Sequence, residues 1–178
     1  MPNWCTNYLG VAGSYKDIQR LIENARGTQA SNEQTTEEKL CFQKLYPAET
    51  SAELVPPDMT PAWYVDRLDK WGTKWEPEVF SPWTLLDGAA DEAPDQSDMD
   101  QEDLERDFCA TIRFDTAWSP PVELFDKVAK DYPQLTFRLR YFELGDGFKG
   151  VAEWRNGIRI KNEPSHWEAI DSMDWART

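Results

Sequence analysis

Strand, helix and strand follow one another in residues 108–141, FCATIRFDTAWSPPVELFDKVAKDYPQLTFRLRY. Residues 108–114 alternate apolar and polar side chains, which is the pattern of a strand with one buried face. Ser119-Pro120 then predicts the start of a helix, and apolar side chains recur at helical spacing over residues 122–132. Residues 135–141 alternate again, so this stretch predicts a strand–helix–strand unit.

The N-terminal end of the chain predicts a second strand–helix pair. Residues 3–12 alternate as a strand does. Ser14 and Asp17 have the spacing of a capping box, which marks the start of a helix. Apolar side chains recur at helical spacing over residues 18–25, and Gly27 predicts the end of that helix.

Two further strands and a tail are expected at the C-terminal end. A turn at Gly145-Asp146-Gly147 leads into a strand over residues 148–154. Asn156-Gly157 is the strongest short hairpin signal in the chain and predicts a last strand over residues 158–161. The remainder, about residues 163–178, is interpreted as a polar C-terminal tail.

The middle of the chain is less regular. An insertion over about residues 27–60 includes a short helix predicted between residues 35 and 45. A helix is expected over residues 61–71, followed by an extended, proline-containing segment at residues 73–80 that fits a sheet edge or irregular structure. An acidic loop is expected over about residues 84–107, because its composition offers little to bury.

The order of elements predicts the fold class. Without the insertion, the order is strand, helix, strand, strand, helix, strand, which is the split arrangement of ferredoxin-like folds. We therefore expect an α+β domain with the βαββαβ order, in which both helices cover one face of an antiparallel sheet and a C-terminal hairpin strand is added. A chain of 178 residues fits one such domain, residues 1–178.

Composition and charge narrow the classes of partner. The chain has 33 Asp and Glu against 19 Lys and Arg, and its net charge of −14 argues against a nucleic-acid partner. No apolar run has the length of a membrane span, and no apolar leader opens the sequence. The three cysteines, Cys5, Cys41 and Cys109, fit reduced thiols. We expect a cytoplasmic protein without a membrane partner; its oligomeric state stays open.

Four short sequence motifs resemble those of a known family. They are Met1-Pro2-Asn3-Trp4-Cys5 with Asn7 and Leu9, Trp71-Gly72-Thr73-Lys74-Trp75, Phe114 to Pro121, and Tyr141-Phe142-Glu143 leading to Gly147-Phe148-Lys149-Gly150. In combination they resemble the YubB ferredoxin-like family, which is found on bacterial plasmids, phages and other mobile elements. The resemblance covers roughly residues 1–26 and 63–154. It implies a ferredoxin-like fold and an origin in a mobile element of a bacterial host cell, and it brings no catalytic motif and no iron–sulfur cluster.

The tryptophan-rich motifs are a candidate binding surface. Trp71, Lys74, Trp75 and Trp118 could line such a surface, since tryptophan offers a large contact area. The alternative is that the indoles build the core and donate their N–H groups to buried carbonyls. We expect the core role, because large aromatic side chains are mostly buried.

The residues that could carry catalysis or hold a metal do not form a recognisable constellation. The carboxylates at predicted strand ends are Asp115, Glu143, Asp146 and Glu153. They could hold Mg²⁺ or Ca²⁺ or act as an acid–base pair, although a solvated rim is the expected role. Cys5 or Cys109 as a nucleophile would need His166, the single histidine. We therefore expect no enzyme activity, no cofactor and no metal site.

Arg138 and Arg140 place two cations on one face of a predicted strand. Ferredoxin-like sheets that bind RNA combine such cations with exposed aromatic side chains. Phe137 and Tyr141 share their parity with core leucines, so the sequence does not reveal the aromatic pair. Cross-strand ion pairs are the expected role of these arginines.

The acidic run is the feature most specific to this chain. Ten acids and one base lie between residues 81 and 107. The acids expected to bind a partner are Asp98, Asp100, Glu102, Asp103, Glu105 and Asp107. We expect a non-enzymatic protein that engages and inhibits a host defence or nucleic-acid-handling protein with a basic surface. The alternative roles are a solvated loop in this segment, and a nucleic-acid-binding domain that uses the open sheet face.

Overall fold

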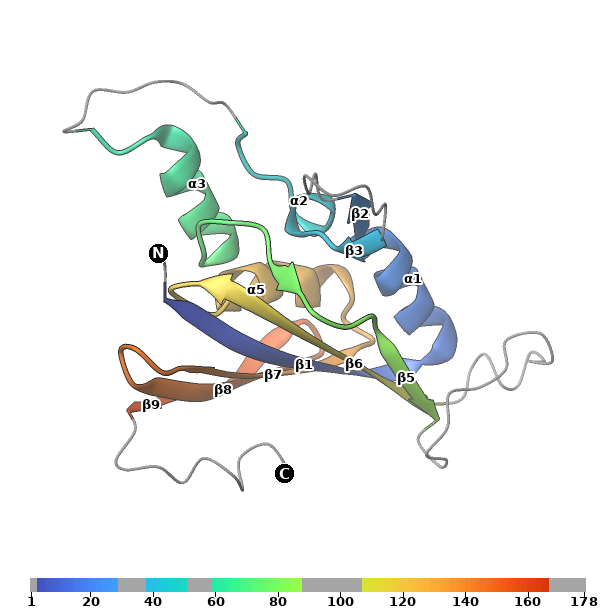
Figure 1. Cartoon of the computed structure of the whole chain (residues 1–178). Helices are drawn as coiled ribbons and strands as arrows, with labels where there is room; N and C mark the ends of the chain where they lie inside the picture. The colour runs from blue at the N-terminus through green and yellow to red at the C-terminus, as the bar shows by residue number, and fades with distance from the viewer. Residues whose placement is uncertain (1–2, 29–37, 51–58, 88–106, 167–178) are drawn as a thin grey trace.

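One antiparallel sheet organises the computed structural model, which describes residues 3–28, 38–50, 59–87 and 107–166 (Figure 1). Its strands are β1 (Trp4–Ser14), β4 (Glu78–Val79), β5 (Thr84–Asp87), β6 (Asp107–Ala117), β7 (Thr136–Glu143), β8 (Phe148–Arg155) and β9 (Ile158–His166). A separate two-stranded sheet pairs β2 (Arg26–Thr28) with β3 (Glu38–Leu40). The helices in the described residues are α1 (Tyr15–Ala25), α2 (Phe42–Leu45), α3 (Ala62–Trp71) and α5 (Val122–Asp131).

The first strand of the chain lies at the centre of the sheet. The strands follow the order β4-β6-β1-β7-β8-β9, and β5 also pairs with β6. All neighbouring strands are antiparallel, and Leu9 of β1 lies opposite Ile112 of β6 and Leu139 of β7. Strands β1, β5, β6 and β7, with helices α1 and α5, make up a βαββαβ unit, so the predicted fold class is confirmed. The strand that precedes β6 in this unit is β5, and not the expected segment at 73–80.

The helices cover one face of the sheet and close the core (Figure 1). As predicted, α1 begins after Ser14, whose Oγ accepts a hydrogen bond from the backbone N–H of Asp17 at 3.2 Å. On α5, Phe125 packs against Phe137 and Trp154, with ring centroids 6.1 Å and 5.9 Å apart. These buried aromatic contacts attach α5 to β7 and β8.

Glu76 joins the inserted region to the body of the domain. Its carboxylate accepts hydrogen bonds from the backbone N–H groups of Phe42 at 2.7 Å and Gln43 at 2.9 Å. These are two of the free donors at the first turn of α2, so Glu76 caps that helix from a distant part of the chain. Burial raises the pKa of Glu76, although both hydrogen bonds favour the carboxylate.

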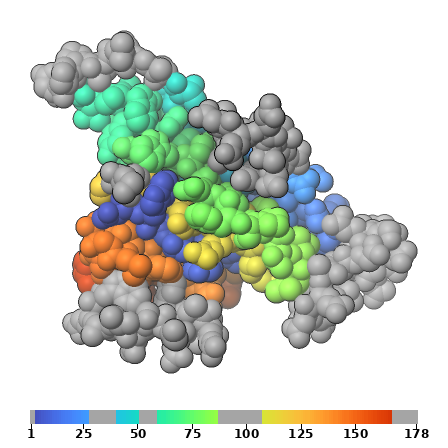
Figure 2. All heavy atoms as spheres, in the orientation of Figure 1, coloured from blue at the N-terminus to red at the C-terminus, as the bar shows by residue number. Residues whose placement is uncertain are grey.

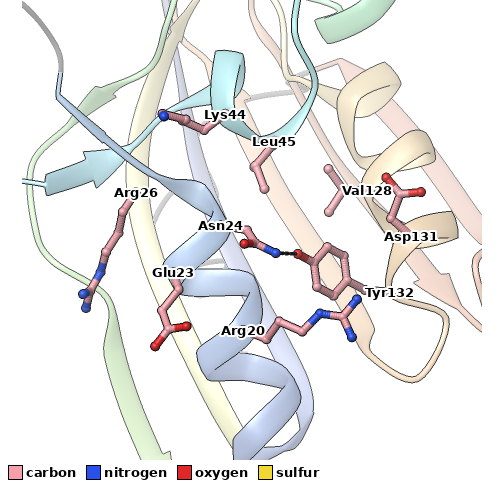
Figure 3. Close-up of a pocket in the computed structure, with 9 residues that line it drawn as sticks. All are labelled: Arg20, Glu23, Asn24, Arg26, Lys44, Leu45, Val128, Asp131 and Tyr132. Atoms are coloured by element: carbon pink, nitrogen blue, oxygen red, sulfur yellow. Dashed lines mark hydrogen bonds between the residues drawn. The ribbon is translucent and has the colours of Figure 1, made fainter.

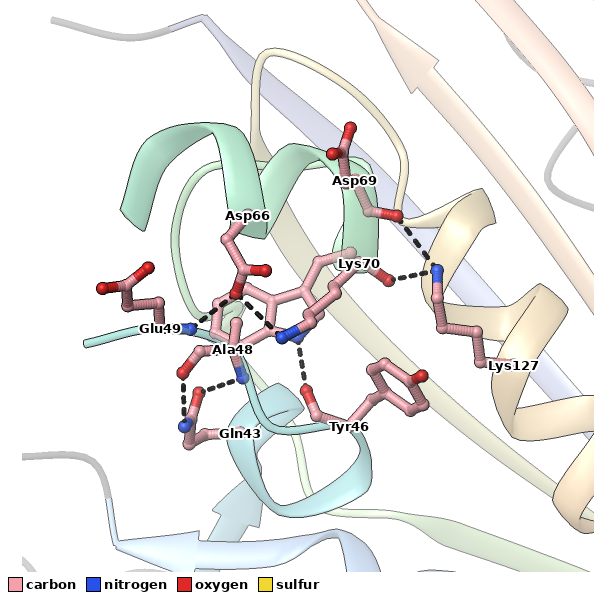
Figure 4. A network of polar contacts seen from close by, with 9 residues as sticks. Gln43, Tyr46, Ala48, Glu49, Asp66, Asp69, Lys70 and Lys127 are labelled. Atoms are coloured by element: carbon pink, nitrogen blue, oxygen red, sulfur yellow. Dashed lines mark hydrogen bonds and ion pairs between the residues drawn. The ribbon is translucent and has the colours of Figure 1, made fainter. Parts of the chain in front are cut away.

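A second set of polar contacts holds α3 in place (Figure 4). The indole N–H of Trp71, a fully buried side chain, donates to the carbonyl of Tyr46 at 2.7 Å. The ammonium of Lys127 on α5 donates to the carbonyls of Asp69 at 3.0 Å and Lys70 at 3.1 Å, near the C-terminal end of α3. The inserted region is therefore anchored to the same side of the sheet as α1 and α5.

Several boundaries differ from the predictions. Within the expected helix at 35–45, residues 38–40 form β3 and only Phe42–Leu45 is helical, because β3 pairs with β2. The expected extended segment at 73–80 contributes only β4, since Pro77 cannot donate to a ladder. Strand β5 lies inside the expected acidic loop at 84–107, where its backbone pairs with β6.

The C-terminal hairpin is longer than predicted. Asn156 and Gly157 form its turn, with φ of 54° and 75°, as the sequence predicts. Strand β9 then runs to His166 and pairs along the whole length of β8, so its second half occupies residues that were expected to begin the tail at 163. In the described part of the chain, no helix is both long and apolar enough to cross a membrane.

Candidate functional site

The face of the large sheet opposite the helices carries aromatic and cationic side chains. Successive side chains of a strand point to opposite faces. On β1, Leu9 and Val11 are buried under the helices, so Tyr8 and Gly10 face the other way. Figure 2 shows the green segment with β4 and β5 lying along β6 (yellow), at the edge of this face.

Tyr8 is the centre of this surface. Arg113 of β6 and Arg140 of β7 lie directly opposite Tyr8 on its two neighbouring strands. The Cζ atom of Arg113 is 5.6 Å from the centroid of the Tyr8 ring, and Phe142 stacks on the same ring with centroids 6.5 Å apart. Arg113 also lies 5.7 Å from the ring of Phe80, which is 58% exposed. We call this set the sheet-face site: Tyr8, Phe80, Arg113, Arg138, Arg140 and Phe142.

A hollow of about 360 Å³ lies within the sheet-face site. Gly10 lies in its lining, and a Cβ atom added at Gly10 would come no closer than 3.9 Å to a neighbouring atom, the carbonyl oxygen of Arg138. The missing side chain therefore leaves open space above the backbone. The charged residues that line the hollow, within the described residues, are Arg113, Arg138 and Arg140. Such a hollow favours a flat, negatively charged ligand.

Two carboxylates temper the positive charge of this face. Glu153 of β8 lies 3.3 Å from Arg138 Nε, which confirms the expected cross-strand ion pair for this arginine. Half of the Arg138 side chain remains exposed, so the pair leaves the guanidinium accessible. The second carboxylate is Asp115, whose pKa is raised by burial. A hydrogen bond from Thr6 and the charge of Arg113 act in the opposite direction and lower this pKa.

The structure brings together two of the sequence motifs, residues 71–75 and residues 114–121. Gly72 has a φ of 77° and ends α3, and a side chain at this position would overlap Glu123. The hydroxyl of Thr73 donates to the carbonyl of Ala117 at 2.9 Å, and the hydroxyl of Ser119 donates to the carbonyl of Gly72 at 2.5 Å. Ser119 therefore links the two motifs by a hydrogen bond. It does not cap α5, although the sequence predicts the start of a helix at Ser119-Pro120.

The predicted tryptophan surface is divided between core and surface. Trp71 is fully buried, as expected for a core residue. Trp118 is 45% exposed with a φ of 71°, so the expectation that it is a core residue is wrong. Trp75 is half-buried between the ring of Trp4, 6.3 Å away, and the ammonium of Lys74, 4.2 Å from its centroid. We call the surface set the tryptophan end: Trp4, Lys74, Trp75 and Trp118.

The predicted acidic binding residues fall mainly outside the described residues. Those outside are Asp98, Asp100, Glu102, Asp103 and Glu105. Asp107 is the first residue of β6, where it is exposed and lies opposite Ser14. The structure therefore leaves the predicted acidic surface as a prediction.

The strand-end carboxylates do not converge on a common point. Glu143 is buried and accepts hydrogen bonds from the backbone N–H groups of Gly145 and Asp146, so it holds the turn between β7 and β8. In the described ranges, no group of three or more histidine, cysteine, aspartate or glutamate side chains could hold a metal ion. Burial raises the pKa of the Cys5 thiol, so Cys5 stays protonated at neutral pH and is a poor nucleophile.

A second hollow, of about 530 Å³, lies between α1, α2 and α5 (Figure 3). The guanidinium of Arg20 lies 5.2 Å from the centroid of the Tyr132 ring, whose hydroxyl accepts a hydrogen bond from Asn24 at 2.6 Å. Cations and the carboxylates of Glu23 and Asp131 line it together. This mixture of charges, without an exposed aromatic platform, favours a solvated groove between helices.

Sequence reasoning found Arg138 and Arg140 but missed the aromatic partners. The aromatic residues next to these arginines in the sequence, Phe137 and Tyr141, are both buried under the helices. The aromatic side chains of the open face are Phe142, which follows the buried Tyr141 on β7, and Tyr8, which precedes the buried Leu9 on β1. The alternation of β1 contained the signal, because Tyr8 has the opposite parity to Leu9.

The comparisons with known proteins concern the fold. Residues 95–176 match the family model described as "Ferredoxin-like domain in Api92-like protein". The crystal structure of a protein api92 from Yersinia pseudotuberculosis is similar, with a TM-score of 0.51 over 96% of this chain and 99% of that chain, at 10% sequence identity. No curated protein matches the chain. The YubB name is not confirmed, but the comparisons support a ferredoxin-like family, and the C-terminal part of this chain resembles the ferredoxin-like domain of Api92-like proteins.

Proposed function

We propose that this protein binds single-stranded nucleic acid on the open face of its sheet. The observation that carries the proposal is the sheet-face site, where Tyr8 and three arginines line a hollow and Phe142 stacks on the Tyr8 ring. This function is the alternative that the sequence raised. It is now favoured over the acidic surface because its residues lie together in the described structure.

The chemistry of the site fits this ligand. Single-stranded nucleic acids bind to proteins through bases stacked on aromatic side chains and phosphates held by a positively charged groove. Tyr8 and Phe142 offer the stacking surface, and Arg138 and Arg140 offer the charge. Arg113 can do both, because a guanidinium that already lies over Tyr8 and Phe80 presents a flat cation to a base or a phosphate. A duplex does not expose base faces, so we expect a preference for single strands.

The overall charge limits the affinity and does not remove the site. Ten of the 33 acids lie between residues 81 and 107, so the negative charge is concentrated in one part of the chain. Long-range repulsion slows the approach of a polyanion at low salt, while contacts at the sheet-face site act over short distances. We expect modest affinity without strong sequence preference, since stacking tolerates every base.

Fluorescence anisotropy with labelled single-stranded oligonucleotides tests the proposal. The double variant Arg138→Ala with Arg140→Ala should weaken binding, and the slope of log affinity against log salt should fall by about 1.4 if both arginines contact phosphate. The control is Lys16→Ala with Lys130→Ala, which removes the same charge from exposed positions on α1 and α5. An equal loss of affinity in the two double variants would mean that only the net charge of the protein matters, which would contradict the proposal.

A second proposal keeps the acidic run. We infer from the concentration of acids between residues 81 and 107 that the protein also engages a host protein with a basic surface. Its test is capture from a nuclease-treated bacterial lysate with the full chain and with residues 88–105 deleted. The deletion is limited to these residues so that β5 and β6 stay intact. A basic protein held by both forms would contradict the acidic interaction.

A further inference from the structure

The tryptophan end lies on the same sheet as the sheet-face site. Trp4 and Tyr8 have the same parity on β1 and are four residues apart, which corresponds to about 14 Å along a strand. Trp4 is 39% exposed, although it is a large apolar side chain. The surface of the sheet therefore has aromatic platforms at two places along its central strand.

The tryptophan end repeats the chemistry of the sheet-face site. The Lys74 ammonium lies 4.2 Å from the Trp75 ring centroid, and Trp75 packs beside Trp4. The backbone of Lys74 is held by Arg67, whose guanidinium donates to the Lys74 carbonyl at 3.3 Å. Indoles beside a fixed cation form a stacking surface with a phosphate partner at hand.

Trp118 is held at the surface by the backbone. Its φ of 71° lies in the left-handed region, which bulky residues rarely adopt. Its N–H donates to the carbonyl of Asn3 at 2.9 Å, so the strained turn is fixed to the residue that precedes Trp4. The fold thus maintains two exposed indoles where β1 begins and β6 ends.

The segment between the two platforms differs from both. Thr6 lies between Trp4 and Tyr8 on β1, and its cross-strand neighbours are Asp115 on β6 and Phe142 on β7. A carboxylate at this place disfavours a phosphate, whereas Phe142 favours a base. The charges therefore suit a strand whose phosphates lie near Lys74 at one end and the arginines at the other.

The geometry points to one continuous path for a single strand, with the tryptophan end as a second stacking platform beyond the sheet-face site. This inference rests on the proposed function. It adds that a short oligonucleotide occupies the sheet-face site alone, while a longer one also reaches Trp4 and Trp75. Affinity should then rise with length until both platforms are filled, and the rise should depend on the tryptophans.

The experiment compares oligothymidylates of two and twelve nucleotides, with anisotropy as the readout, because two nucleotides are too short to span the distance between the platforms. Trp4→Ala should leave the affinity for the short probe unchanged and lower that for the long probe about tenfold, the effect of one lost stacking contact. Trp4→Phe should restore most of the affinity, since it keeps an aromatic ring. Val65→Ala, an exposed position on α3, is the control for loss of exposed apolar surface.

The outcomes separate the inference from the proposed function. Equal affinity of the wild-type protein for both lengths, or an equal effect of Trp4→Ala on both, would overturn the continuous path and leave the sheet-face site intact. Failure of the wild-type protein to bind either probe would overturn both proposals. Circular dichroism of Trp4→Ala checks that the fold is retained. If it is not, Lys74→Ala provides the same comparison and should weaken binding of the long probe only.

Discussion

The two faces of the large sheet are built from the same strands and carry opposite chemistry. Under the helices, β7 presents the buried side chains of Phe137, Leu139 and Tyr141. On the open face, the residues between them are Arg138 and Arg140. Because a strand alternates its side chains, one short stretch can specify a core and a binding surface at once. Substitutions on the two faces should therefore affect different properties, stability on one and binding on the other.

The largest effect on stability is expected on the core face. Phe137→Ala removes a fully buried ring that packs against Phe125, so the free energy of unfolding should fall by about 3–5 kcal/mol. Phe142→Ala changes the same residue type on the same strand but on the open face, and should cost much less. Urea unfolding of both variants measures the difference. Similar losses would break the contrast between the two faces.

Glu76 should matter for stability and not for binding. Glu76→Ala leaves two backbone donors of α2 without their partner, which should lower the free energy of unfolding by about 1–3 kcal/mol. Oligonucleotide affinity should be unchanged, because Glu76 lies on the helix side. Urea unfolding and anisotropy on the same samples test both statements. A loss of affinity at full stability would contradict this division of roles.

The pH dependence of Glu76 has a definite sign. Its pKa is raised in the folded state, so between the unfolded and folded values the native protein binds more protons than the unfolded chain. This contribution is greatest at acidic pH and is lost as the pH rises above the ordinary glutamate value of about 4.3. Glu76→Gln should therefore lose less stability than the wild type as the pH rises above about 4.3. A parallel decline in both proteins would contradict the assignment.

On the open face, Tyr8→Ala should weaken binding of single strands about tenfold, the typical value of one stacked base. Its effect on the free energy of unfolding should stay within about 1 kcal/mol, because the ring is only half-buried. Tyr8→Phe keeps the ring and should bind nearly as well as the wild type. Anisotropy titrations measure the affinities, and a large loss in Tyr8→Phe would assign the effect to the hydroxyl instead of stacking.

Gly10→Val should sharpen the contrast further. The new side chain would occupy the hollow, since the space above Gly10 is open, and should lower the affinity less than Tyr8→Ala does. Valine suits a strand better than glycine, so the free energy of unfolding should rise by up to about 1 kcal/mol. A protein that is more stable and binds less would show the hollow to be functional. Unchanged affinity would show that the ligand does not enter it.

The smallest effect is expected for Glu153→Gln. The change releases Arg138 from an ion pair in which half of the arginine side chain is exposed, so stability should be nearly unchanged. Affinity should rise by no more than about fivefold, the equivalent of ~1 kcal/mol. Anisotropy at low salt gives the best resolution for this difference. A decrease in affinity would mean that Glu153 positions Arg138 for binding.

Most of the fold could be predicted because its signals are local. The alternation in β1, β6 and β7, the Ser14 cap and the Asn156-Gly157 turn each depend on residues close in sequence. Strand β5 was missed because it is short and adjoins the acidic run, and only its pairing with β6 makes it a strand. The cap that Glu76 gives to α2 joins residues far apart in the chain, so no local pattern announces it.

The candidate site was predicted only in part. The sequence predicts the two arginines of β7, but not their aromatic partners Tyr8 and Phe142, because the aromatic residues next to these arginines in the sequence lie on the buried face. The usual burial of large side chains predicts a core position for Trp118. Its exposure follows from the left-handed backbone of the turn after β6, which composition does not reveal. The site thus depends on which strands become neighbours.

The central position of β1 has a consequence for how the protein reaches this structure. Residues 4–14 are synthesised before their partners, which are residues 107–117 and 136–143. At synthesis rates of about 5–20 residues per second, the first strand waits on the order of ten seconds for its neighbours. Pairing across such a separation also closes a long loop, which slows folding. We expect α5, β7, β8 and β9 to assemble as a local unit, and β1 to join this unit to β6 when it pairs with both neighbours.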